Sequence, residues 1–333
     1  MDIMIMFDQT GGPEVLRVAR IELGKLDDDK VRIRQYAAGV NFIDVYYREG
    51  LYPAELPSGI GLEAAGEIIG VGSKVHDVKV GDRVAYFGGP LGAYANVRDI
   101  DPQFLVALPD GLPYEGAASS FLRSATAYCW VTKVYPVKKG DTVLVHAAAG
   151  GAGLQLVQWA KSMRAKVIGT CGSHEKEKIA RAFGCDEVIL YKDYDFVDAV
   201  MSITNHQGVD AVFDSIGKDT FSASIACLKP LGTMVSFGNA TGAVPPVSLL
   251  EVNAKKPVYL IRPSVFQFMK TVEERRAVGK AVFDQWLTGK VKPVINETYP
   301  LHDAAIAHAD LAARKTTGSI VLITSQQVNA NAA

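Results

Sequence analysis

The sequence of 333 residues has little cysteine, no long apolar run and no excess of either charge. Its four cysteines are scattered without the paired spacing of a zinc site or a disulfide framework, so we expect buried, reduced thiols. No segment approaches the roughly 18 unbroken apolar residues of a membrane span. The first seven residues lack the basic and apolar regions of a signal peptide, which predicts a cytoplasmic protein.

Charge and length narrow the class further. Lys and Arg number 35 against 36 for Asp and Glu, so no surplus of positive charge attracts the chain to nucleic acid or to an anionic membrane. The length suggests about two domains, and 48% apolar residues suffice for two packed cores. These properties are those expected of a soluble enzyme.

The stretch from Val143 to Gly153 is the most informative part of the chain. A β-branched run enters a turn of small residues, and an apolar helix follows. In the fingerprint G-x-G-x-x-G, the second glycine lets the backbone approach a pyrophosphate and the third lets helix and strand pack closely. Gly150 and Gly153 supply both, and Ala148 holds the first position, where a small residue can turn if its φ stays negative. We therefore expect a dinucleotide pyrophosphate at Gly150, Gly151, Ala152 and Gly153.

The end of the next β run favours NADPH over NADH. An NAD site presents an Asp or Glu about 20 residues after the glycine-rich turn, where it binds the ribose 2′-hydroxyl. This chain has Gly172 and Ser173 there, followed by Lys176. Ser173 and Lys176 can donate to a 2′-phosphate at a helix start, which also favours anions. The alternative is that Lys176 belongs to a solvated helix face.

The chain reads as three blocks. Residues 1–122 alternate short β runs with turns, which predicts a mostly β domain. Residues 123–265 alternate strands and helices, which predicts a doubly wound parallel sheet of the Rossmann type. We expect its strands at Thr142–His146, Lys166–Thr170, Glu187–Leu190, Asp210–Asp214, Thr233–Phe237 and Val258–Ile261. Residues 266–333 contain an expected helix at Glu273–Thr288 and a strand at Gly318–Ile323, and this tail is predicted to fold back onto the first block.

Further cofactor contacts are expected where the parallel strands end. Tyr191 follows the third strand, where it either stacks on adenine or is a plain sheet-edge residue. The contacts expected after the later strands are Ser215, Phe237, Gly238, Asn239, Arg262 and Ser264.

Several motifs together resemble one family. They are Gly11–Leu16, Gly39–Asp44, Gly50–Pro53, Gly61–Gly66, Val80–Val84 and His146–Gly151. This combination is similar to the zinc-free quinone oxidoreductases, the zeta-crystallin-like branch of the medium-chain dehydrogenase/reductase superfamily. The resemblance implies an α/β fold with a GroES-like catalytic domain (1–122 and 266–333), a Rossmann NADPH-binding domain (123–265), an active site between them, and a homodimer that pairs Rossmann edge strands. It also implies cofactor contacts at Asn41, Phe42, Thr126, Gly172, Ser173, Lys176, Tyr191, Ser215, Phe237, Gly238, Asn239, Arg262 and Arg314.

Within this resemblance, the positions of zinc ligands are changed. Zinc alcohol dehydrogenases have a cysteine at the place of Asn41 and a histidine at that of Leu62. Asp44 and Glu63 remain, but two carboxylates without Cys or His make a poor zinc site. We expect a protein without metal, in which Glu63 orders a turn through local hydrogen bonds.

The missing metal restricts the acceptor. Hydride delivery to an ordinary carbonyl places charge on one oxygen and calls for a Lewis acid or a strong donor. A quinone or an α,β-unsaturated carbonyl delocalises that charge itself. Tyr46 and Tyr52 are the expected walls for such a flat acceptor, with Asn41 as an amide donor, whereas Tyr47 is expected to point away. The interpretation is an NADPH-dependent quinone oxidoreductase. The alternatives are a reductase of enals or enones, and a cofactor-bound protein with a structural or RNA-associated role.

Overall fold

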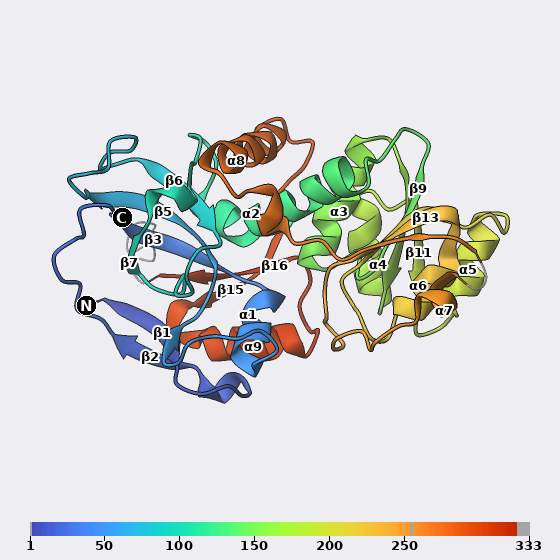
Figure 1. Cartoon of the computed structure of the whole chain (residues 1–333), viewed down its shortest axis with the longest axis horizontal. Helices are drawn as coiled ribbons and strands as arrows, with labels where there is room; N and C mark the ends of the chain where they lie inside the picture. The colour runs from blue at the N-terminus through green and yellow to red at the C-terminus, as the bar shows by residue number, and fades with distance from the viewer. Residues whose placement is uncertain (1, 254–255, 325–333) are drawn as a thin grey trace. The chain divides into compact units, whose positions relative to one another are not determined.

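The computed structural model describes residues 2–253 and 256–324 and divides the chain into two compact units (Figure 1). Unit 1 contains the chain up to Leu122, Met269–Thr288 and the chain from Pro293 on. Unit 2 contains Arg123–Phe268 and Gly289–Lys292. None of the described helices is both long and apolar enough to cross a membrane.

Unit 1 is dominated by β-structure. Its larger sheet has the order β15-β16-β3-β5-β6-β8, with β7 also paired to β3, and its smaller sheet has the order β2-β1-β4. The strands are β1 (Ile3–Phe7), β2 (Arg17–Arg20), β3 (Val31–Val40), β4 (Ser58–Gly59), β5 (Glu63–Val71), β6 (Arg83–Phe87), β7 (Val97–Ile100), β8 (Leu105–Ala107), β15 (Ile295–Pro300) and β16 (Ser319–Ile323). The helices are α1 (Phe42–Glu49), α8 (Val272–Leu287), α9 (Ala304–Ala312) and the start of α2 (Tyr114–Cys129), with short 3₁₀ turns at Pro13–Val15, Pro102–Phe104 and Leu301–Asp303.

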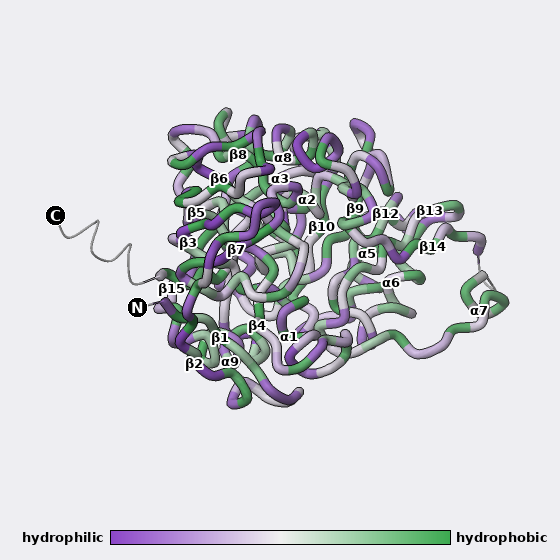
Figure 2. Tube along the Cα trace, turned by 60° about the vertical axis from the view of Figure 1, so that its left-hand side comes forward, coloured by the Kyte–Doolittle hydropathy of each residue, from purple (hydrophilic) through white to green (hydrophobic). Residues whose placement is uncertain are grey.

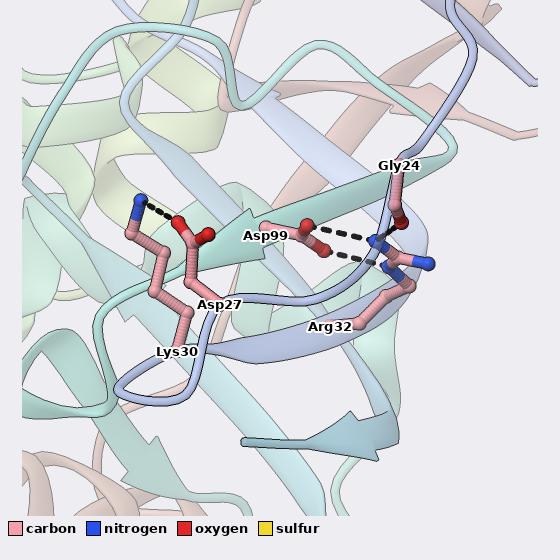
Figure 3. A network of polar contacts seen from close by, with 5 residues as sticks. All are labelled: Gly24, Asp27, Lys30, Arg32 and Asp99. Carbon is pink, nitrogen blue, oxygen red and sulfur yellow. Dashed lines mark hydrogen bonds and ion pairs between the residues drawn. The ribbon is translucent and has the colours of Figure 1, made fainter. Parts of the chain in front are cut away.

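Strand β3 organises the larger sheet because it pairs with three others. Val31 and Ile33 alternate with partly exposed polar residues, as expected for a strand with one buried face. On the other face, Arg32 lies opposite Asp99 of β7 and binds both carboxylate oxygens at 2.7 and 2.9 Å (Figure 3). The same guanidinium donates to the Gly24 carbonyl at 2.8 Å, so the loop before β3 is fixed to the sheet. Opposite charges directly across a ladder support this register.

The C-terminal tail completes this sheet. Strand β16 pairs antiparallel with β3, so that Ile320 lies opposite Val40, and β15 pairs parallel with β16.

Helix α8, which precedes β15, begins one residue before the expected start. It begins at a capping box in which Thr271 and Glu274 exchange backbone and side-chain hydrogen bonds.

Unit 2 contains a six-stranded parallel sheet of the order β11-β10-β9-β12-β13-β14. The strands are β9 (Thr142–Val145), β10 (Lys166–Cys171), β11 (Glu187–Leu190), β12 (Val209–Asp214), β13 (Leu228–Ser236) and β14 (Tyr259–Ile261). The helices are α3 (Gly151–Ser162), α4 (His174–Ala182), α5 (Phe196–Ile203), α6 (Phe221–Cys227) and α7 (Leu249–Asn253), with a π-helical turn at Trp130–Val134 after α2 and a 3₁₀ turn at Val265–Phe268. This is the Rossmann order, with the reversal between β9 and β12, and right-handed crossovers put α3 and α4 on one face and α5 and α6 on the other.

Apart from shifts of one residue at strand ends, the structure differs from the sequence-based expectations in the start of β13 and in the boundary of unit 2. Strand β13 starts at Leu228 instead of Thr233, because its ladder continues through an irregular segment in which Leu231 has a φ of 63°. Residues 266–268 and 289–292, expected with the tail, belong to unit 2. There the Lys292 carbonyl accepts from Gln155 and Gln158 of α3 at 2.9 and 3.1 Å.

Candidate active site

The glycine-rich turn joins β9 to α3 and exposes the first amides of the helix. Gly150 is the N-cap and has no side chain, so the first amides of the helix, those of Gly151, Ala152 and Gly153, receive no side-chain cap from it. A Cβ on Gly153 would collide with the Ala147 carbonyl oxygen, and one on Gly150 would lie 3.2 Å from it. The helix start can thus bind an anion, and a side chain at Gly153 would force the backbone of the turn to shift.

The unusual conformation in this turn belongs to Ala147. Its φ is 50°, in the left-handed region, whereas Ala148 is not among the residues of positive φ. Ala148 therefore has the negative φ expected for a non-glycine residue at the first position of the fingerprint. The strained residue is Ala147, one position earlier. Left-handed alanine is disfavoured by its Cβ and persists where neighbouring contacts hold it.

The end of β10 brings four of the predicted residues together. Ser173 caps α4 by accepting from the Lys176 amide at 3.3 Å. The Tyr191 hydroxyl lies 2.7 Å from the position that a Cβ on Gly172 would occupy, so the tyrosine lies against that glycine. Glu177, in the first turn of the same helix, is held by Arg181 at 3.0 Å. This corner has a hydroxyl, a lysine and an aromatic ring that is 45% exposed.

The ends of β12, β13 and β14 also meet. A Cβ on Gly238 would collide with the Ser215 carbonyl, and Arg262 donates to the Gly238 carbonyl at 3.3 Å. The Phe237 amide donates to the Asp214 backbone carbonyl at 2.8 Å, and the centroid of the Phe237 ring lies 6.0 Å from that of Trp130. Asn239, the next residue after Gly238, is also buried.

Three predicted contacts lie at other places. Thr126 is half-buried on α2, and Ser264 is exposed after β14. Arg314 is exposed just after α9, in unit 1, with a φ of 57°. As for the other site residues, a cofactor role for these three stays a prediction.

In unit 1, Asn41 is held by a buried carboxylate. It is the N-cap of α1, and its Nδ2 donates to Glu63 Oε2 at 2.8 Å. Glu63 Oε1 accepts from the Leu122 amide at 2.6 Å. The expectation that Glu63 makes local hydrogen bonds is wrong, because these partners are 22 and 59 residues away. Since a carboxylate only accepts, the Asn41 amide nitrogen donates to Glu63, and the Asn41 side chain also accepts from the Asp44 backbone amide in the capping box of α1. The donor role expected of Asn41 toward an acceptor stays a prediction.

The tyrosines form one aromatic cluster in unit 1. The ring centroids of Tyr46 and Tyr52 lie 5.3 Å apart at 68°, and those of Tyr47 and Tyr52 lie 5.7 Å apart at 80°. Phe42 adds a fourth ring, 6.3 Å from Tyr46. Tyr47, which the sequence placed outside the acceptor group, therefore shares Tyr52 with Tyr46. Burial raises the pKa of Tyr47, so its phenol is protonated at neutral pH.

A buried polar chain lies beneath α1 and was not predicted from the sequence. Arg48 Nη1 lies 3.2 Å from His308 Nδ1, His308 Nε2 lies 3.1 Å from the Tyr94 hydroxyl, and Tyr94 donates to Asp44 at 2.8 Å. Asp44 also accepts from the Asn41 amide at 2.8 Å. Burial and the charge of Arg48 lower the pKa of His308 to about 3, so the ring is neutral. This row of hydrogen bonds fixes the start of α1, with Asn41 at its N-cap and Tyr46 within it.

Comparison with known proteins agrees with this arrangement. Residues 27–110 match the alcohol dehydrogenase GroES-like domain, and residues 151–271 match the zinc-binding dehydrogenase family. The chain is 44% identical to a quinone oxidoreductase of Pseudomonas aeruginosa over 96% of its own length and 98% of that protein's. It is 37% identical to a 2-haloacrylate reductase of a Burkholderia species, over 97% of this chain and 99% of the relative.

A solved structure gives the same result. The quinone oxidoreductase of Escherichia coli complexed with NADPH superposes with a TM-score of 0.94 at 42% identity, covering 96% of this chain and 99% of that one. The GroES-like and Rossmann units define a protein of the medium-chain dehydrogenase/reductase class. Within that class, the chain belongs to the quinone oxidoreductase family.

The zinc in the name of the matching family does not fit the residues present here. Asn41 and Leu62 supply neither a thiolate nor an imidazole. Asp44 and Glu63 each accept hydrogen bonds from buried protein groups. In the described part of the chain, no group of three or more His, Cys, Asp or Glu side chains is placed to hold a metal ion.

Proposed function

We propose that this chain is an NADPH-dependent quinone oxidoreductase that binds its cofactor along the strand ends of unit 2 and its acceptor at the tyrosines of unit 1. The observation that carries the proposal is the pairing of an uncapped helix start at Gly150–Gly153 with a corner formed by Ser173, Lys176 and Tyr191. The first favours a pyrophosphate and the second a 2′-phosphate.

Each strand end has a separate part in cofactor binding. The amides of α3 bind the pyrophosphate, Ser173 and Lys176 bind the 2′-phosphate, and Tyr191 stacks on the adenosine. The loops at Ser215, Phe237–Asn239 and Arg262 orient the nicotinamide end. When bound, NADPH supplies a hydride to the acceptor.

The residues of unit 1 orient a flat acceptor. Tyr46 and Tyr52 present aromatic rings whose edge-to-face packing fixes their orientation, and they exclude water from one side of the acceptor. Asn41, whose amide nitrogen donates to Glu63, contacts the acceptor beside these rings. A quinone spreads the incoming charge over its ring. The residues of unit 1 therefore need only orient the quinone, and the step needs no Lewis acid to stabilise the charge.

NADPH oxidation over a panel of quinones and enals tests this function directly. We expect quinone-dependent turnover that a metal chelator leaves unchanged, together with tighter binding of NADPH than of NADH. Turnover of no quinone, or loss of activity with stoichiometric zinc on chelation, would contradict the proposal.

A second candidate is the reduction of α,β-unsaturated carbonyl compounds. It is supported by the similarity to a 2-haloacrylate reductase, whose name indicates a conjugated acid as substrate. Such a substrate also delocalises charge, as an enolate, and fits the same metal-free orientation by tyrosines. Higher kcat/KM for enals or haloacrylates than for quinones in the same panel would favour this candidate.

We also propose a homodimer through the edge of the Rossmann sheet. Strand β14 ends the described sheet, and Tyr259, Leu260 and Ile261 are all exposed. Leu249 and Leu250 of α7 are exposed too, and Figure 2 colours this segment as hydrophobic. An uncovered apolar edge strand favours pairing with a second copy. Sedimentation velocity of the chain and of Leu260→Lys tests this, and a wild-type monomer would contradict it.

We place the activity in the cytoplasm. The support is the state of the four cysteines, which are all free and buried, as in a reducing compartment. Fractionation of the native host checks this placement.

A further inference from the structure

A buried hydrogen-bond network lies directly behind the glycine-rich turn. His146 follows β9 and is 2% exposed. Its Nδ1 lies 3.0 Å from Thr170 Oγ1 of β10, and its Nε2 lies 2.9 Å from Ser224 Oγ of α6. One imidazole therefore links the turn to two neighbouring elements of the sheet layer.

The direction of this network follows from its ends. Ser224 donates its hydroxyl to Asp214 Oδ2 at 2.9 Å, because a carboxylate only accepts. Ser224 must then accept from His146 Nε2–H, which leaves Nδ1 to accept from the Thr170 hydroxyl. Thr170 Oγ1 in turn accepts from the Ala147 amide at 3.3 Å. Burial lowers the pKa of His146, which keeps the ring in the neutral form that this direction requires.

The last link of the network is the residue with the strained backbone. Ala147 has a φ of 50°, which alanine rarely adopts without outside support. Its carbonyl accepts from Gly150 at 2.8 Å and lies where a Cβ on Gly153 would be. The conformation of Ala147 therefore sets where the first amides of α3 lie.

We infer that His146 is a positioning residue for dinucleotide binding: as the Nε2–H tautomer, it orients Thr170 onto the Ala147 amide and keeps Ala147 left-handed. The amides at Gly151–Gly153 are then held ready for a pyrophosphate. This inference rests on the proposed function, since it concerns the same turn, and it assigns a role to a side chain that is buried behind that turn. A network of this kind persists where its members jointly fix one geometry.

A double-mutant cycle tests the inference through the dissociation constant of NADPH, measured by titration calorimetry. In the wild-type background, we expect His146→Phe to weaken binding by about tenfold or more, since two buried hydroxyls lose their partner. In an Ala147→Gly background, the same change should cost about threefold or less, because glycine adopts positive φ without a Cβ. Equal losses in both backgrounds, or wild-type binding by His146→Phe, would overturn the inference.

A second variant covers the case in which His146→Phe does not fold. Thr170→Val keeps the side-chain shape and removes only the hydroxyl between His146 and the Ala147 amide, so it should show the same loss and the same rescue. Thr220→Val is the matched control. It removes a different hydroxyl from Asp214 (2.7 Å) and should leave NADPH affinity unchanged. Loss of affinity in Thr220→Val equal to that in Thr170→Val would overturn the inference.

The tautomer gives a readout without cofactor. Long-range ¹H–¹⁵N correlation of the cofactor-free protein should show His146 protonated on Nε2 alone at neutral pH. An Nδ1–H tautomer or an imidazolium would overturn the network as assigned. A wild-type chain that binds no NADPH would instead contradict the proposed function, and the spectrum would still decide the state of His146.

Discussion

Acid should destabilise unit 1 through one histidine, His308. Its pKa falls from an ordinary 6.5 to about 3 because the ring is buried and faces Arg48. Below pH 6.5 the unfolded chain binds a proton at this residue and the folded chain does not. Stability is therefore complete above pH 6.5 and is lost as the pH falls toward 3.

The slope can be worked out from these values. One proton of difference changes the free energy of unfolding by about 1.4 kcal/mol per pH unit. Between pH 7.5 and pH 5.0, His308 alone should therefore remove about 2 kcal/mol. Burial also lowers the pKa of His146, so the wild-type slope contains a second histidine of the same sign.

Substitution isolates the part that belongs to His308. Glutamine retains one acceptor for Arg48 and one donor for Tyr94 but does not titrate, so His308→Gln should lose about 2 kcal/mol less than wild type between the two pH values. Urea unfolding followed by circular dichroism at pH 7.5 and 5.0 measures this difference. His302→Gln is the control, since that side chain is 64% exposed, and it should keep the wild-type slope. The reasoning is refuted if His308→Gln also keeps that slope.

Three further predictions concern the site. Lys176→Ala should weaken NADPH by roughly tenfold or more, as expected for a lost charge-assisted contact, and should leave NADH and the exposed control Lys178→Ala unchanged; titration calorimetry with both cofactors checks this. Gly153→Ala should destabilise the fold by about 1–3 kcal/mol, more than Gly150→Ala does, because its Cβ meets the Ala147 carbonyl more closely; equal melting temperatures would contradict this. Tyr52→Ala should raise the acceptor KM several-fold and Tyr52→Phe only slightly, since ring stacking is worth about 0.5–1.5 kcal/mol; a thousandfold fall in kcat for Tyr52→Phe would make the hydroxyl a general acid.

Features encoded by neighbouring residues were predictable from the sequence. The β-branched runs gave the six strands of unit 2, and Glu187–Leu190 matches β11 at both ends. Strand β13 was placed five residues late because Pro230 and Gly232 conceal its irregular start. The corner at Gly172, Ser173, Lys176 and Tyr191 was also accessible, since parallel strands end at one edge of the sheet.

Features that depend on distant partners were not accessible in the same way. Glu63 looked like a local turn former because its partners, Asn41 and Leu122, are far away in the sequence. Through these contacts Glu63 orients the Asn41 amide at the start of α1. The sequence could not show this orientation, and the donor role expected of Asn41 stays a prediction.

The two buried histidines show the same limit more sharply. Each imidazole is neutral, and the donor and acceptor roles of its two nitrogens are set by a group that can act in one way only. For His146 this group is Asp214, which accepts from Ser224, and for His308 it is Arg48, which donates to the ring. The direct partners of His146, Thr170 and Ser224, lie 24 and 78 residues from it. Those of His308, Arg48 and Tyr94, lie 260 and 214 residues from it. No spacing motif records such pairs. Each network ends on a backbone amide at a candidate site, Ala147 in unit 2 and Asn41 in unit 1. The backbone of each site is therefore held by long-range contacts, whereas the residues expected to contact a ligand lie in short motifs.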